Sequence, residues 1–237
     1  HYLVMAGRTR AILNPVGKAQ IDHLPSGWLQ GGSRLDLVLK PGADGSIAGS
    51  GTAVLTGLFS PYYLMKGAGS EAEDFVKARV RALFDGAELV GWNPQAFDDK
   101  AVEIAFAFTV KLPEKKPGER VYLSVPRPFD AALSGIDRVR VERSLSADGN
   151  ATVPCQLNVS CTMEPPKGWK IVALPTESNV KNEVGSATVS VESTPDGTKT
   201  CKRSLAFEGA LVRPADYAKL RALLLAFGED RLVLERE

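Results

Sequence analysis

The chain has 237 residues, of which 44% are hydrophobic and 24% are charged, and its formal net charge is +1. These are the values of an ordinary globular protein, and a chain of this length can bury a core without disulfides or metals. The near-neutral charge argues against duplex nucleic acid as the main partner, because a duplex-binding protein usually carries a basic surface. No apolar run approaches the roughly 20 residues that a membrane-spanning helix needs, so we expect no membrane span.

Residues 1–33 are predicted to be a linker or the tail of an upstream domain. The stretch Ile12–Trp28 mixes Pro and Gly with short apolar pieces, a composition typical of irregular structure. The first residues lack the charged start and apolar segment of a secretory signal. We therefore expect a processed chain or a fragment of a longer one.

A first β-rich segment is predicted over residues 34–130. Leucines alternate with other residues across Leu35–Leu39, and Asp44–Gly45 then turns the chain into Ile47–Leu58. Alternation on both sides of an Asp-Gly pair indicates a β-hairpin, because glycine accepts the positive φ of the turn. The glycines within the second strand are expected to serve turns and bulges.

An amphipathic helix is predicted next, capped by Ser70 and ended by Gly86. Its apolar residues recur with helical spacing at Ala72, Val76, Val80 and Leu83. The chain then returns to strands at Glu88–Trp92, Val102–Val110 and Arg120–Val125. Asp98 and Asp99 are expected in a turn between the first two of these strands.

A second β-rich segment is predicted over residues 131–237. Its expected strands are Arg138–Leu145, Ala151–Met163, Trp169–Leu174, Ala187–Ser193 and Thr200–Phe207. A helix at Pro214–Phe227 and a last strand at Leu232–Leu234 close the chain. The two segments together predict a mainly β protein of the α+β class, with antiparallel, sandwich-like sheets, one central helix and one C-terminal helix.

Three cysteines leave two possibilities for disulfide bonding. Cys155 and Cys161 lie about 20 Å apart if their run is extended, which is beyond disulfide reach. Either of them can bridge Cys201, or the thiols are buried and free. The odd count, without C-x-x-C or a nearby histidine, gives no zinc pattern, so no metal or cofactor is predicted.

A thiol hydrolase would need a histidine beside one of these cysteines. Apart from the terminal His1, the chain has His23, which lies in a loop-like stretch and is interpreted as a surface residue. Carboxylate pairs for glycoside hydrolysis can be drawn from Asp36, Glu88, Asp98, Asp99 and Glu103, but such pairs occur in any protein rich in acidic residues. We therefore predict no catalytic, cofactor-binding or metal-binding residue.

The tryptophans offer one possible binding surface. Trp28, Trp92 and Trp169 would form a sugar-binding platform if they were exposed together. Single tryptophans in β proteins more often pack partly buried, with the indole N–H hydrogen bonded. Packing is the interpretation that we favour, and it is strengthened for Trp169 by Gly168 at the entry to its strand.

Several phrases of the sequence resemble the C-terminal region of bacterial transglutaminase-like proteins of the DUF3857/transglutaminase/DUF3858 type. The resemblance runs from Leu35 to Glu237. It is carried by LVLKPGADGSIAGSG, SEAEDFVKARVRALF, RVERSLSADG, PPKGWKIVALP and LRALLLAFGEDRLVLERE. The segment VPCQLNVSCTMEPP departs from it, because plain aliphatic residues would be expected there.

The resemblance implies a multi-domain envelope protein, in the periplasm or at the cell surface, whose catalytic Cys, His and Asp lie in an upstream core. No stretch of this chain matches those residues. The leading hypothesis is therefore a non-catalytic accessory domain that packs on that core or binds another protein. The alternatives are a free-standing carbohydrate- or peptide-binding module and a thiol hydrolase that uses His23.

Overall fold

The computed structural model describes residues 11–13, 19–21, 31–42, 45–66, 69–98, 101–124, 151–152, 156–209, 211–228 and 232–237. The strands are β1 (Ala11–Leu13), β2 (Ala19–Ile21), β3 (Gly32–Pro41), β4 (Ile47–Thr56), β5 (Ala87–Phe97), β6 (Ala101–Val110), β7 (Arg120–Leu123), β8 (Ala151–Thr152), β9 (Gln156–Met163), β10 (Trp169–Ala173), β11 (Ser178–Asn182), β12 (Gly185–Ser193), β13 (Lys199–Phe207), β14 (Leu211–Val212) and β15 (Leu232–Arg236). The helices are α1 (Tyr62–Lys66), α2 (Ser70–Leu83) and α3 (Tyr217–Phe227), with 3-10 turns at Gly57–Phe59 and Pro214–Asp216.

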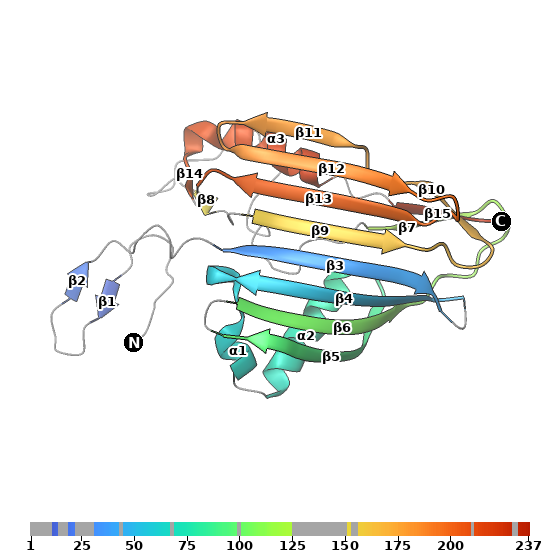
Figure 1. Cartoon of the computed structure of the whole chain (residues 1–237), viewed down its shortest axis with the longest axis horizontal. Coiled ribbons are helices and arrows are strands. Elements are labelled where there is room, and N and C mark those ends of the chain that lie inside the picture. The colour runs from blue at the N-terminus through green and yellow to red at the C-terminus, as the bar shows by residue number, and fades with distance from the viewer. Residues whose placement is uncertain are drawn as a thin grey trace.

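An eight-stranded sheet dominates the fold, with the order β11-β12-β13-β9-β3-β4-β6-β5 (Figure 1). Strands β3 and β9 pair in parallel, with Arg34 opposite Asn158 and Asp36 opposite Ser160, and the other neighbours pair antiparallel. The parallel pair was not expected from the sequence. It joins four strands from residues 34–130 to four strands from residues 131–237, so one sheet contains both predicted segments.

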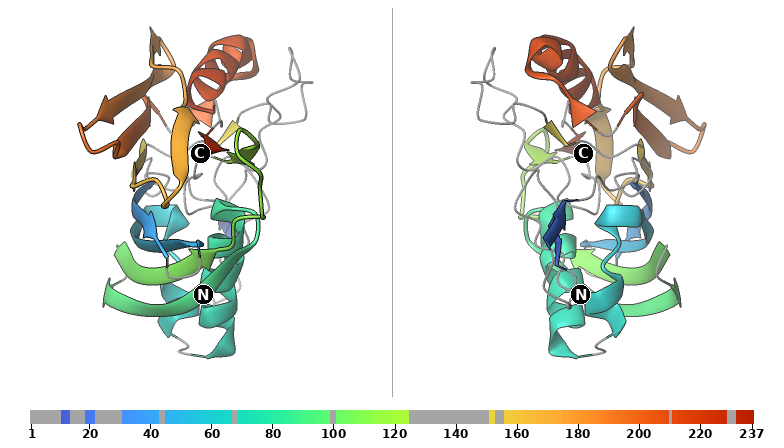
Figure 2. Two further views of the ribbon diagram at one scale, coloured as in Figure 1. Left: turned by 90° about the vertical axis from the view of Figure 1, so that its right-hand side faces the viewer. Right: turned by 90° about the vertical axis from the view of Figure 1, so that its left-hand side faces the viewer.

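One face of this sheet forms the core. Strands β3, β6, β9 and β13 alternate buried and less buried residues, and the buried positions all point to the same side. Helix α2 contacts β5, while α3 contacts β11, β12 and β13. Both helices lie on this side of the sheet (Figure 2). The opposite side, which we call the open face, looks toward the viewer in Figure 1.

A second, three-stranded sheet completes the core with the antiparallel order β10-β15-β7. Five of its buried side chains belong to the same hydrophobic cluster as those of the large sheet: Val121, Leu123, Trp169, Leu232 and Leu234. Two pairs of short strands, β1-β2 and β14-β8, are also present. The mainly β fold and its two longer helices confirm the predicted fold class. The division of the chain near residue 130 stays a prediction about folding units.

The glycines of β4 have a different role from the one expected. Gly49 and Gly51 lie in regular register opposite Phe108 and Phe106 of β6, and no bulge interrupts that pairing. A Cβ atom at either position would collide with the facing phenylalanine ring. The missing side chains therefore make room for the two rings, which stack with centroids 6.0 Å apart. Turns are served elsewhere, for example by Gly45 and its φ of 72°.

The helices follow the sequence pattern with small differences at their ends. The predicted stripe of α2 is buried, but the N-cap is Gly69 rather than Ser70, and no side chain caps the helix. Pro214 begins a 3-10 turn before α3 instead of the α-helix itself. Helix α3 buries Tyr217, Leu220, Leu223, Leu224 and Phe227.

The edges of the large sheet were only partly foreseen. Strand β5 extends to Phe97 and is interrupted twice in its register, beside Gly91 and beside Pro94. Strand β11 was not predicted, because SNVKN is short and mostly polar. The predicted turn at Asp98 is present, with the Asp98 side chain accepting a hydrogen bond of 2.8 Å from the amide of Ala101. The strand predicted at Arg138–Leu145 lies outside the described residues.

A buried arginine fastens α3 to the sheet. Arg203 of β13 is 3% exposed, and its Nη1 donates a 3.0 Å hydrogen bond to the carbonyl of Phe227 at the end of α3. Its guanidinium carbon lies 5.0 Å from the centroid of the Phe227 ring. The end of a helix carries partial negative charge, and an aromatic face attracts cations, so both contacts stabilise the buried charge.

We expect Arg203→Ala to lower the free energy of unfolding by about 2–4 kcal/mol, because it leaves a cavity and removes the donor to a buried carbonyl. Chemical denaturation followed by circular dichroism measures the change. Lys202→Ala, at the next residue on the exposed side of the same strand, is the control and should shift stability by less than about 0.5 kcal/mol. Equal effects of the two substitutions would contradict the anchoring role of Arg203.

Candidate functional site

The open face carries a shallow hollow across four adjacent strands. Its floor and walls include side chains from β3, β9, β13 and β12. The register arranges these side chains in two rows, Thr188, Ser204, Asn158 and Arg34 in the first, and Ser190, Lys202, Ser160 and Asp36 in the second. We call this set of eight side chains the polar hollow.

The polar hollow presents mostly neutral hydrogen-bonding groups. Asn158, Ser160 and Ser204 are half-buried at its centre. At one side, Arg34 Nε lies 2.7 Å from Asp36 Oδ2. In the second row, between Ser190 and Ser160, Lys202 Nζ lies 2.7 Å from Glu192 Oε1. Each cation therefore has an acidic neighbour, and the hollow has little net charge to offer a ligand.

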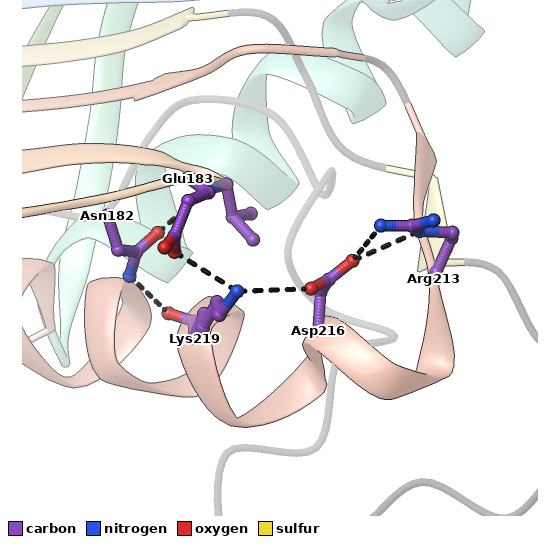
Figure 3. Close-up of polar contacts among 6 residues, drawn as sticks. Asn182, Glu183, Arg213, Asp216 and Lys219 are labelled. Carbon is purple, nitrogen blue, oxygen red and sulfur yellow. Dashed lines mark hydrogen bonds and ion pairs between the residues drawn. The ribbon is translucent and has the colours of Figure 1, made fainter.

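A charge cluster joins the start of α3 to the β11–β12 turn (Figure 3). Lys219 Nζ lies 3.1 Å from Glu183 Oε2 and 3.4 Å from Asp216 Oδ1. Asp216 Oδ2 in turn lies 3.1 Å from Arg213 Nη2. The amide of Asn182 also donates a 3.0 Å hydrogen bond to the Lys219 carbonyl. The cluster thus ties the helix to the hairpin at several points.

The contacts of this cluster shift its proton equilibria. A hydrogen bond to Glu183, ahead of the opposing effect of burial, raises the pKa of Lys219. A backbone hydrogen bond followed by the bond from Lys219 lowers the pKa of Glu183. Burial acts to raise the pKa of Asp216, but the combined contacts with Arg213 and Lys219 outweigh it and lower that pKa. The three groups are therefore fully charged near neutral pH and act as structural ion pairs.

Two of the three cysteines face each other across β9 and β13. Cys161 lies directly opposite Cys201, and both are buried free thiols. Burial, with a smaller contribution from Cys201, raises the pKa of Cys161 to about 12. Burial also raises the pKa of Cys201. Both groups are thus protonated at neutral pH, the form that is a poor nucleophile.

The ladder geometry explains why this cysteine pair is not bridged. The Glu208 amide donates a 3.0 Å hydrogen bond to the Val184 carbonyl, so the even-numbered residues of β13 direct their backbone groups toward β12. The Val191 amide of β12 donates to the Glu177 side chain, on the side of β12 away from β13. Odd-numbered residues of β13 therefore direct their backbone groups toward β9, which makes Cys161 and Cys201 a hydrogen-bonded pair. The Cβ atoms of such pairs lie about 5.5 Å apart, whereas a disulfide requires about 3.8 Å. Of the two possibilities left by the sequence, free thiols hold for this pair, and Cys155 lies outside the described residues.

The other residues weighed in the sequence do not assemble into a site within the described part of the chain. Trp92 is half-buried and packs on the core, and Trp169 is 7% exposed beneath Arg236, 5.6 Å from its guanidinium carbon. Strand β4 separates Asp36 from Glu103. Glu88 lies opposite Thr109 on β5 and β6, and Asp98 lies in its turn. His23, Trp28 and Asp99 lie outside the described residues.

The described ranges contain no group of three His, Cys, Asp or Glu side chains positioned to hold a metal ion. None of their helices combines the length and the apolar composition needed to cross a bilayer. The polar hollow was not predicted from the sequence, because its side chains look like ordinary outward-facing residues of separate strands. The one signal was the repeated Ser, Thr and Asn at alternate positions of β9 and β12.

One part of the chain matches a known protein family. Residues 149–231 match the family described as "Domain of Unknown Function with solved-structure structure (DUF3858)". The chain is also similar to the crystal structure of a putative protease from Parabacteroides distasonis, with 15% sequence identity and a TM-score of 0.37. That similarity covers 64% of this chain and 40% of the other chain. Curated proteins give no match.

We expect Cys161 and Cys201 to resist thiol reagents at pH 8 while the protein is folded, because neither thiolate is populated or accessible. Alkylation followed by peptide mass spectrometry reports each cysteine separately. Both should be labelled completely once guanidinium chloride unfolds the chain, and both should stay reduced in air-equilibrated buffer. Rapid labelling of either in the folded state, or a Cys161–Cys201 disulfide peptide, would contradict this geometry.

We also expect the charge cluster to make stability fall in acid. A carboxylate whose pKa is lowered by folding stabilises the protein above its unfolded pKa, and this contribution disappears as the pH falls through the folded pKa. Unfolding free energies measured between pH 7 and pH 3 should therefore decrease less steeply for Asp216→Asn, which should also be less stable than the parent at pH 7. Glu88→Gln, on exposed strand β5, is the control. If the free energy of unfolding of Asp216→Asn fell as steeply with pH as that of the parent, the cluster would not be the cause of the lower stability in acid.

Proposed function

We propose that the chain is a non-catalytic accessory domain of a transglutaminase-like envelope protein, which packs on the catalytic core of that protein or binds a protein partner. The observation that supports this most directly is the family match to residues 149–231. It overlaps the phrases around Trp169 and within α3 through which the sequence resembles the last part of such proteins. Periplasmic or cell-surface location is part of the same proposal.

The state of the thiols supports an accessory rather than a catalytic role. A thiol hydrolase depends on a thiolate made available by a neighbouring base. Cys161 and Cys201 are instead buried in the core with raised pKa values. Their surroundings thus favour packing over nucleophilic attack. The described tryptophans likewise pack on the core, which disfavours an aromatic sugar platform built on Trp92 and Trp169.

The two edges of the large sheet differ in their capacity to bind an extended segment of a partner. Strand β5 is blunted by two register shifts and by Pro94, features that oppose edge pairing. Strand β11 is regular, and the ladder alternation directs the backbone groups of Asn179 and Lys181 away from β12. The β11 edge is therefore the one through which we expect a partner strand to add.

The direct test is to produce this chain and the region encoded immediately upstream in its gene as separate polypeptides. Light scattering after size-exclusion chromatography should detect a one-to-one complex. This chain alone should catalyse neither amine incorporation into glutamine peptides nor amide hydrolysis. Turnover by the isolated chain that is lost in its cysteine variants, or an upstream region without a catalytic core, would overturn the proposal.

One substitution tests the edge itself. Asn179→Pro removes an amide that points away from β12, so it should weaken the complex at least about tenfold while the β11–β12 bonds remain. Asn179→Ala keeps that amide and serves as the matched control. A complex that survives Asn179→Pro unchanged would assign the contact to another surface but leave the accessory role standing.

A further inference from the structure

We propose that the polar hollow binds a neutral, polyhydroxylated ligand of the oligosaccharide class. This inference stands independently of the accessory role, because it rests on a different surface and on different residues. Its basis is the chemistry of the side chains that the register brings together on β12, β13, β9 and β3.

The neutral side chains of the hollow match hydroxyl groups. Thr188, Ser190, Ser160 and Ser204 each offer a hydroxyl that donates and accepts, and Asn158 offers an amide that does both. Sugar hydroxyls have the same dual character, so each ligand group can be satisfied in either direction. A ligand with one type of group, all donors or all acceptors, would use only half of this capacity.

The charges of the hollow disfavour an ionic ligand. Arg34 contacts Asp36, and Lys202 contacts Glu192, with 2.7 Å between the charged atoms in each pair. An anion would have to compete with the carboxylates for these cations, and a cation would have to compete with Arg34 and Lys202 for the carboxylates. The same four side chains can still form hydrogen bonds with neutral hydroxyls.

The sheet fixes the backbone positions from which these groups project before any ligand arrives. They project from four hydrogen-bonded strands, and the central Asn158, Ser160 and Ser204 are half-buried. In the next row, the hydroxyls of Thr162 and Thr200 lie 3.0 Å apart and extend the polar surface along β9 and β13. Groups held by rigid strands lose little conformational entropy on binding.

The described side chains of the hollow include no aromatic ring, so we expect weak binding. Exposed neutral hydrogen bonds contribute little each, which places the dissociation constant on the order of 1 mM. The test is a titration of the 15N-labelled chain with maltohexaose and, separately, chitohexaose, followed by amide chemical shifts. At least one of the two sugars should shift the amides around Asn158, Ser160 and Ser204 in a saturable manner.

Variants locate the site. The double substitution Asn158→Ala and Ser160→Ala should weaken binding about five- to tenfold, because two central hydrogen-bonding groups are lost. Ser50→Ala and Thr52→Ala, on strand β4 of the same open face, form the matched control and should leave the affinity unchanged. Thermal unfolding of each variant confirms that the fold is retained.

Charged probes complete the test. Short polyglutamate and polylysine peptides should not shift the same amides at equal concentrations. The proposal fails if neither sugar shifts them at about 20 mM, far above the expected dissociation constant. It also fails if a charged peptide binds there more tightly than either sugar, or if the β4 control weakens binding as much as the double variant does.

Discussion

The parallel pairing of β3 with β9 is the constraint on which the rest of the structure depends. It joins strands that are far apart in sequence into one sheet, and it does so in the register that points Leu35, Leu37 and Leu39 to the same side as Leu157 and Val159. A slip of one residue would turn one of these two sets toward the open face. The common core under α2 and α3, and the polar hollow above it, both exist only in this register.

Helix α3 is held against the sheet at both ends by polar contacts, and the contact at its C-terminal end complements its dipole. Near its start, the carboxylates of Asp216 and Glu183 share Lys219. At its end, Arg203 donates to the Phe227 carbonyl from within the core. A cation at the C-terminus of a helix is the stabilising arrangement. Strands β12 and β13 are therefore backed by a firmly placed helix on their core side.

Local features could be predicted from the sequence, and long-range ones could not. The hairpin around Gly45, helix α2 and helix α3 depend on spacing and end residues that lie within a few turns of each other. Nothing local indicates that β3 pairs with β9, and the polar strand β11 lacks a pattern of its own. Gly49 and Gly51 were misread for the same reason, because the rings that they accommodate belong to β6. The hollow follows this rule, since only the register unites Arg34 with Asn158.

The two faces of the large sheet carry side chains of different chemistry. The core face holds the described thiols, protonated and enclosed among aliphatic side chains, where reaction is disfavoured. The open face holds hydroxyls, an amide and paired charges, which form hydrogen bonds readily but lack an activated nucleophile among the described side chains. Such a surface is suited to recognition. The two proposed contacts are compatible with each other, because a strand added beside β11 would leave the hollow over β9 and β13 accessible.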